Sequence, residues 1–182
     1  MPKTQKSLKT PLRYPGGKSR AVVKLLQFLP DLTQVREFRE PFLGGGSVAL
    51  EITKRYPDIE IWVNDLYEPL YNFWCELQHN GQDLQDAIWS KKNKYPDMDT
   101  ARTLFNQSKE DVNDKELSNF DRAVAFYVVN KCSFSGLTES SSFSQQASQS
   151  NFSFNGIERL AEYSKLCLLY TSPSPRDRGC SR

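Results

Sequence analysis

A glycine-rich run at residues 41–47 has the composition of a loop that binds a nucleotide. Gly44, Gly46 and Ala49 satisfy the GxGxxG/A spacing, and Asp65 follows about twenty residues later. Glycines let the backbone approach a ligand closely, and a helix start offers unpaired N–H groups. An acidic residue at the end of the next strand can accept hydrogen bonds from a ribose diol. The pattern predicts a site for a nucleoside-containing cofactor, with a tight turn that binds no ligand as the alternative.

A second glycine motif, Tyr14-Pro15-Gly16-Gly17-Lys18-Ser19, resembles the end of a phosphate-binding loop. The full pattern requires a glycine five residues before Gly17, and Leu12 stands at that position. The sequence therefore argues against a nucleoside triphosphatase. Lys18 is then either an ordinary exposed lysine or a cation directed at a ligand that bears a carboxylate.

The elements that must position these motifs follow from the hydrophobic patterning. We expect a strand at 35–40, a helix at 47–56 and an alternating strand at 59–63. Strand, glycine turn, helix and strand make one βαβ unit, which implies a parallel sheet. Near the N-terminus, we expect Ser19 to cap a helix that ends at Pro30.

The sequence after Leu66 is typical of helices, and no convincing strand follows for about ninety residues. Ser118 and Asp121 form a capping box at the start of one of these helices. A serine-rich stretch at 140–153 contains interspersed phenylalanines, which favours a segment that packs against or contacts something over a simple linker. We expect a mostly helical lobe inserted after the second strand.

The composition excludes several classes of protein. Hydrophobic residues make up 38% of the chain, but no apolar run approaches the ~20 residues of a membrane span. The first ten residues lack the apolar core of a secretory signal. The cysteines at 75, 132, 167 and 180 form no CxxC pair, and a lone His79 cannot complete a zinc site. We expect no membrane, no metal and free thiols in a reducing cytoplasm.

Charge is distributed unevenly along the chain. The net charge is +2, and residues 1–30 hold seven basic residues and no acidic one. A basic N-terminus on a neutral body suits a polyanionic partner. A solvated, lysine-rich leader is the alternative explanation.

Together the motifs resemble the Dam-like (D12 class) adenine-N6 DNA methyltransferases. Residues 12–18 resemble the N-terminal motif of that family, 38–48 its cofactor loop, and 64–72 its acidic strand end and following helix. Residues 130–137 resemble part of its hairpin-bearing target-recognition lobe, and order and spacing agree over 8–166. The resemblance implies an α/β, Rossmann-like, S-adenosylmethionine-dependent methyltransferase with an inserted helical recognition lobe.

The resemblance also implies roles for particular residues. Tyr14 would stack near the adenine of the cofactor, Lys18 would lie by its methionine carboxylate, and Asp65 would bind the ribose. The implied cofactor set is Tyr14, Lys18, Phe42, Gly44, Gly46 and Asp65. The implied DNA-contacting set is Lys9, Arg13, Asn130, Ser133, Phe134, Ser135, Gly136 and Leu137. The intact enzyme would be a cytoplasmic monomer that acts on double-stranded DNA.

Two features depart from the family pattern. The family transfers the methyl group at an Asp-Pro-Pro-Tyr signature, where the acid and a carbonyl hold the amine of a flipped adenine. The 182 residues contain no such tetrapeptide, so we assign no catalytic residue and expect this chain to be inactive alone. Ser133, Ser135 and Glu139 stand where Dam itself has glycine, asparagine and arginine, so the resemblance does not imply a GATC target.

The C-terminal residues 167–177 resemble a one-frame translation of a transposon-end sequencing adapter. We interpret 167–182 as a non-native tail without a fold, in which Leu168 and Leu169 at most cover a sheet edge. A natural disordered tail is the alternative. The expected organisation is the N-terminal fragment of a longer enzyme, with a cofactor half-site at 1–72 and a helical recognition lobe at 73–166.

Two other functions stay open at this point. A dinucleotide-dependent oxidoreductase would share the glycine loop and Asp65, but it does not account for Gly16, Gly17 and Lys18 or for the recognition-like lobe. A non-catalytic DNA-binding fragment is the third reading. Titration with S-adenosylmethionine against NAD separates the first two, and DNA binding without cofactor favours the third.

Overall fold

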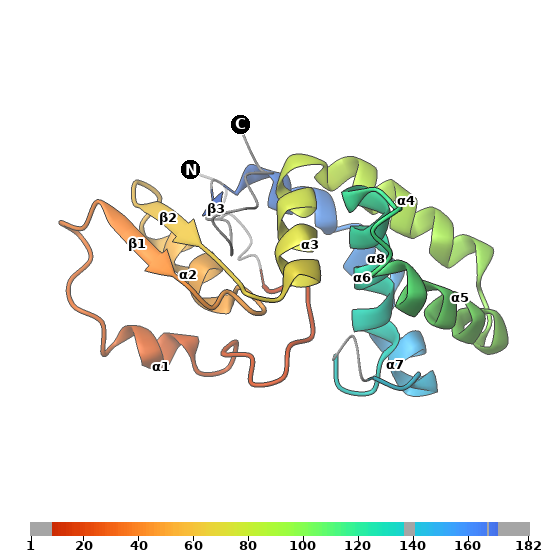
Figure 1. The fold of residues 1–182 in the computed structure, drawn as a ribbon. Coiled ribbons are helices and arrows are strands. Elements are labelled where there is room, and N and C mark those ends of the chain that lie inside the picture. Colours follow the sequence, from red (N-terminus) through yellow and green to blue (C-terminus); the bar gives the residue numbers. More distant parts are fainter. Residues whose placement is uncertain (1–8, 137–140, 167, 171–182) are drawn as a thin grey trace, which may run out of the picture.

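The computed structural model describes residues 9–136, 141–166 and 168–170, and Figure 1 shows a small sheet on one side and a cluster of helices on the other. Helix α3 stands between these two parts (Figure 1). The elements, in chain order, are α1 (Val22–Leu26), β1 (Glu37–Glu40), α2 (Ser47–Arg55), β2 (Glu60–Val63), α3 (Glu68–His79), α4 (Gly81–Lys94), α5 (Met98–Asp111), α6 (Asn119–Cys132), α7 (Gln145–Ser150), α8 (Phe154–Ile157), the 3-10 helix η1 (Leu160–Lys165) and β3 (Leu168–Tyr170).

The sheet is parallel and has the strand order β1-β2-β3. Phe38 of β1 lies opposite Ile61 of β2, and α2 connects the two strands. The βαβ unit predicted from the hydrophobic pattern is therefore confirmed. A parallel connection of this kind brings the carboxyl ends of β1 and β2 to one edge, which is where ligands of such sheets bind.

Strand β3 lies within the segment 167–182, which we interpreted as a tail without a fold that at most covers a sheet edge, and it pairs with the edge of β2. Ile61 of β2 pairs with Leu168, whose side chain is only 3% exposed. The side-chain amide of Gln78 on α3 donates to the Leu168 carbonyl at 3.1 Å and accepts from its N–H at 3.2 Å. Pairing with the edge of β2 and the two bonds to the Gln78 side chain explain why this short segment adds as a strand. Residues 167 and 171–182 lie outside the described part.

The first helix is shorter than expected. Helix α1 ends at Leu26 rather than near Pro30, and its N-cap residue is Ala21, with no capping side chain. The Ser19 hydroxyl lies 2.8 Å from the hydroxyl of Ser47 at the start of α2 instead. The expected cap is therefore wrong, because Ser19 pairs with a side chain far along the chain.

The helices between β2 and β3 pack around α6, which is buried from Arg122 to Asn130. Phe73 of α3 stacks on Tyr127 of α6 with ring centroids 5.8 Å apart. At the start of α6, the Ser118 hydroxyl accepts from the Asp121 N–H at 3.0 Å, so the predicted capping box is confirmed. Aromatic packing thus joins the helix that follows the sheet to the centre of the helical cluster.

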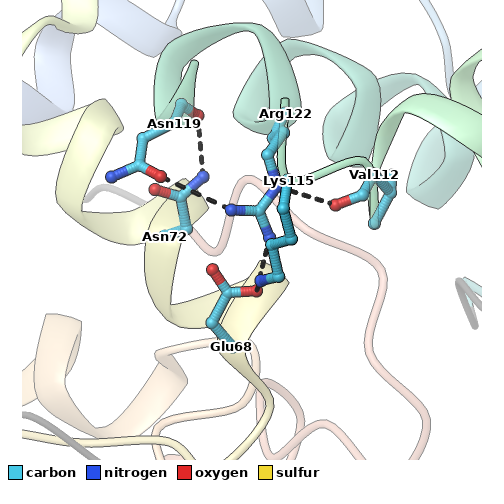
Figure 2. A network of polar contacts seen from close by, with 6 residues as sticks. All are labelled: Glu68, Asn72, Val112, Lys115, Asn119 and Arg122. Carbon is cyan, nitrogen blue, oxygen red and sulfur yellow. Dashed lines mark hydrogen bonds and ion pairs between the residues drawn. The ribbon is translucent and has the colours of Figure 1, made fainter. Parts of the chain in front are cut away.

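A polar network fixes the start of α3 against the loop between α5 and α6 (Figure 2). Arg122, buried on α6, donates to the Glu68 carboxylate at 2.5 Å and to the Val112 carbonyl at 3.1 Å. The Lys115 ammonium lies 3.1 Å from the same carboxylate. Burial alone would raise the pKa of Glu68, but the hydrogen bonds from Arg122 and Lys115 outweigh it and lower that pKa.

Candidate functional site

The glycine loop is held between two aromatic rings. Gly44 and Gly46 have φ angles of 51° and 68°, which residues with a side chain rarely adopt. A Cβ on Gly44 would lie 2.9 Å from the Tyr14 ring, and one on Gly46 would lie 2.7 Å from the Trp74 ring. The Trp74 indole N–H also donates to the Gly44 carbonyl at 3.0 Å. Both glycines are therefore required by close packing as well as by backbone conformation.

Asp65 lies at the carboxyl end of β2, directly beside this loop. Its carboxylate accepts from the N–H of Gly44 at 2.8 Å and from the N–H of Tyr67 at 3.0 Å. The residue is only 8% exposed, so its first role is to fix the glycine loop to the sheet. A carboxylate has about four acceptor sites, which leaves capacity for a further donor such as a ribose hydroxyl.

A cleft of about 330 Å³ opens above the loop, and Tyr14, Lys18, Phe42 and Gly44 all line it. These are four of the six residues expected to bind a cofactor. A second hollow of about 330 Å³ shares Tyr14 with the cleft. The other two expected residues, Gly46 and Asp65, are buried and do not line either space.

Glu40 is a residue of the cleft that sequence reasoning missed. It is the last residue of β1, and its carboxylate accepts from the Ala49 N–H at the start of α2 at 2.8 Å. Its pKa is raised to about 7, mainly by burial and to a smaller extent by the nearby Asp65, against the opposing effects of the Ala49 hydrogen bond and of Lys18. The position at a strand end, matching that of Asp65, is the signal that could have found it.

The cleft combines groups of different chemistry. Tyr14 presents a partly exposed ring, and burial together with the charge of Asp65 raises the pKa of its hydroxyl. The Lys18 ammonium donates to the Gly16 carbonyl at 3.1 Å and lies near enough to Glu40 to affect its charge. An aromatic face, a cation and a carboxylate that line one cleft suit a zwitterionic ligand with a ring.

The residues expected to contact DNA divide into buried and exposed groups. Asn130, Ser133 and Gly136 are buried, so they support the loop from inside and cannot contact DNA directly in this conformation. Phe134 is 76% exposed and Ser135 is exposed beside it. Lys9 is exposed and Arg13 is half-buried, while Leu137 lies outside the described residues.

The loop that carries Phe134 has the start of a hairpin. Ser133 forms an antiparallel bridge with Phe143, and the Phe134 N–H donates to the Ser142 carbonyl at 3.1 Å. The Ser144 N–H donates to the Cys132 carbonyl at 2.8 Å. The end of α6 and the serine-rich stretch therefore lie side by side.

The described residues hold no cluster of three or more histidines, cysteines or acids that could bind a metal. Cys75 and Cys132 are buried free thiols. In the same part of the chain, no helix has both the length and the apolar character needed to cross a membrane.

Comparison with known proteins gives two findings. The family model for the D12 class N6 adenine-specific DNA methyltransferases matches residues 14–167. The Type II methyltransferase M.MjaIII of Methanocaldococcus jannaschii is 23% identical to this chain over 138 residues. That match covers 69% of this chain and 46% of the relative, so the chain spans about half the length of that protein.

Proposed function

Because the chain belongs to the D12 class N6 adenine-specific DNA methyltransferase family, we propose that it carries the cofactor cleft and part of the DNA-recognition surface of such an enzyme. The reaction is transfer of a methyl group from S-adenosylmethionine to N6 of an adenine in double-stranded DNA. The parallel order β1-β2-β3, with the cleft near the carboxyl ends of β1 and β2, supports a Rossmann-like arrangement.

The observation that carries this proposal is the convergence of Tyr14, Lys18 and Glu40 on one cleft. S-adenosylmethionine contains an adenine ring, a ribose diol, and an amino acid with one ammonium and one carboxylate. The Tyr14 ring suits the adenine, Lys18 suits the carboxylate and Glu40 suits the ammonium. Asp65, beneath the loop, has acceptor capacity for the ribose.

When bound, the cofactor would supply an electrophilic methyl group on a sulfonium; N6 of the target adenine would bond to the methyl carbon, S-adenosylhomocysteine would leave with the C–S electron pair, and the N6 proton would pass to solvent. Residues of this chain bind and orient the donor, and such alignment contributes on the order of 7–11 kcal/mol for well-oriented reactants. No catalytic residue is assigned, because the 182 residues contain no Asp-Pro-Pro-Tyr signature to hold the target amine.

The test is ligand binding by the 182-residue chain, measured by isothermal titration calorimetry with S-adenosylhomocysteine and with NAD. We expect binding of the first and no binding of the second. Tyr14→Ala and Lys18→Ala should each weaken binding of S-adenosylhomocysteine at least about tenfold, the scale of one lost charged or stacking contact. The matched control is Lys24→Ala, an exposed lysine on α1 that does not line the cleft. Preference for NAD would favour the oxidoreductase and contradict the proposal.

A further inference from the structure

The Asn130 side chain holds the backbone of Arg13 on both sides. The Arg13 N–H donates to the Asn130 amide oxygen at 2.9 Å, and the Asn130 amide nitrogen donates to the Arg13 carbonyl at 2.7 Å. The same nitrogen donates to the Gly136 carbonyl at 2.9 Å. Asn130 is almost fully buried, so these bonds do not compete with water and fix the segment in one position.

The Arg13 side chain reaches into the same loop. Its two terminal nitrogens donate to the carbonyls of Ser133 at 2.6 Å and Phe134 at 2.9 Å. Gly136 is packed so closely that a Cβ there would lie 2.6 Å from the Arg13 carbonyl oxygen. Arg13 was expected to contact DNA, but the structure places these two nitrogens on loop carbonyls.

Arg13 therefore lies between the cofactor cleft and the turn at residues 133–136. The next residue, Tyr14, lies against Gly44 and lines the cofactor cleft. On the other side, the carbonyls that Arg13 holds belong to the turn that exposes Phe134 and Ser135. Consecutive Cα atoms are about 3.8 Å apart, so the residue that Asn130 holds and the ring that lines the cleft are joined by a single backbone step.

We propose that Arg13 and Asn130 are positioning residues that couple the cofactor cleft to the Ser133–Gly136 turn, so that cofactor occupancy and DNA affinity depend on each other. The coupling rests on the proposed function, since it presumes that the cleft binds the cofactor and the turn contacts DNA. By thermodynamic linkage, a cofactor that tightens DNA binding is itself tightened by DNA to the same extent.

The test compares the wild-type chain with Arg13→Lys, which keeps the positive charge but loses the planar fork that spans two carbonyls. Fluorescence anisotropy gives the Kd of a labelled mixed-sequence duplex without and with saturating S-adenosylhomocysteine. In the wild type we expect the ratio of these two Kd values to be at least about 5, the lower end of ordinary coupling. In Arg13→Lys the ratio should fall towards one. Lys9→Gln, an exposed N-terminal charge, serves as the control that weakens DNA binding and leaves the ratio unchanged.

Hydrogen exchange gives a second readout that needs no DNA. S-adenosylhomocysteine should slow amide exchange at residues 133–136 in the wild type, and this protection should be absent in Arg13→Lys. A wild-type ratio of one, or an Arg13→Lys ratio equal to that of the wild type, would overturn the coupling while leaving cofactor binding intact. Failure of the wild type to bind S-adenosylhomocysteine would instead contradict the proposed function itself. Thermal unfolding of each variant separates these outcomes from misfolding.

Discussion

Glu40 joins the end of a strand, the start of a helix and the wall of the cleft. Burial is the main reason that its pKa rises from 4.5 to about 7. Between these pH values the folded protein holds a proton that the unfolded chain releases. The free energy of unfolding therefore has a contribution from Glu40 that is favourable at low pH and is lost as pH rises through this window.

We predict that Glu40→Gln removes this pH dependence. The glutamine oxygen can still accept from the Ala49 N–H, and the variant carries no buried charge at neutral pH. It should be more stable than the wild type by about 2–3 kcal/mol at pH 8 and nearly equal at pH 4. Urea unfolding measures the free energy of unfolding at both pH values. Glu60→Gln, a substitution at an exposed position on β2, is the matched control and should leave the free energy of unfolding unchanged at both pH values.

Only some residues of the candidate site could be predicted from the sequence. Tyr14 and Lys18 could be predicted because an aromatic ring and a cation flank a local glycine motif. The role of Gly46 could not, because its contact is with Trp74 on a helix that lies nearly thirty residues on. Glu40 was missed because its burial and raised pKa arise only when α2 and the neighbouring Asp65 are in place.

At the scale of elements, local signals predicted the βαβ unit and the start of α6 but not the cap of α1, and contacts between distant positions could not be predicted. The capping box of α6 depends on residues three apart, and it was confirmed. The pairing of Glu68 with Arg122 joins positions 54 residues apart, and no local pattern predicts it. Helix α1 is shorter than its sequence predicts because only Val22 of its five residues is buried, and a short helix with little tertiary packing gains little stability.

The network in Figure 2 supports a prediction about Glu68. Glu68→Ala should leave the Arg122 guanidinium, whose side chain is 5% exposed, without its carboxylate partner. Removing one member of a buried pair is costly, but the Glu68 side chain is 39% exposed, so we expect a loss of about 1–3 kcal/mol at pH 7. Because the pKa of Glu68 is lowered on folding, this contribution should vanish in acid, as pH falls through the folded value.

Urea unfolding of Glu68→Ala and of Lys115→Ala compares how much each substitution lowers the free energy of unfolding. The Lys115 side chain is exposed, and its loss should cost less than about 1 kcal/mol. Equal effects of the two substitutions would show that the buried guanidinium does not depend on Glu68.

At the scale of the whole molecule, the sheet and the helices depend on each other. The chain leaves the sheet after β2, forms the helical cluster, and returns at β3 to pair with β2 again. The family match over 14–167 agrees with the resemblance predicted from the motifs, but it stops at the residue before this strand. A strand of three residues is too short to show an alternating hydrophobic pattern, so β3 could not be predicted from the sequence. Its position is set by pairing with β2 and by the hydrogen bonds to Gln78.

The last prediction asks whether β3 is an integral strand or an opportunistic contact of an adapter-like sequence. Leu168→Ala removes a side chain that is 3% exposed in the core between the sheet and α3. If the strand is integral, the free energy of unfolding should fall by about 2–4 kcal/mol, the usual cost of such a cavity. Leu66→Ala is the matched control, because Leu66 is 81% exposed and its loss should cost less than about 0.5 kcal/mol.

Thermal and urea unfolding of the two variants decide between these readings. If Leu168→Ala is as harmless as Leu66→Ala, the folded state gains no stability from the packing of this segment. In that case the strand contributes no cooperative stability, and the core of the protein ends with η1. A loss several times larger than that of the control means that β2 requires a neighbour at this edge, since its inner face and backbone groups are otherwise open to water. The residues at 168–170 are then an integral part of the sheet, whatever the origin of their sequence.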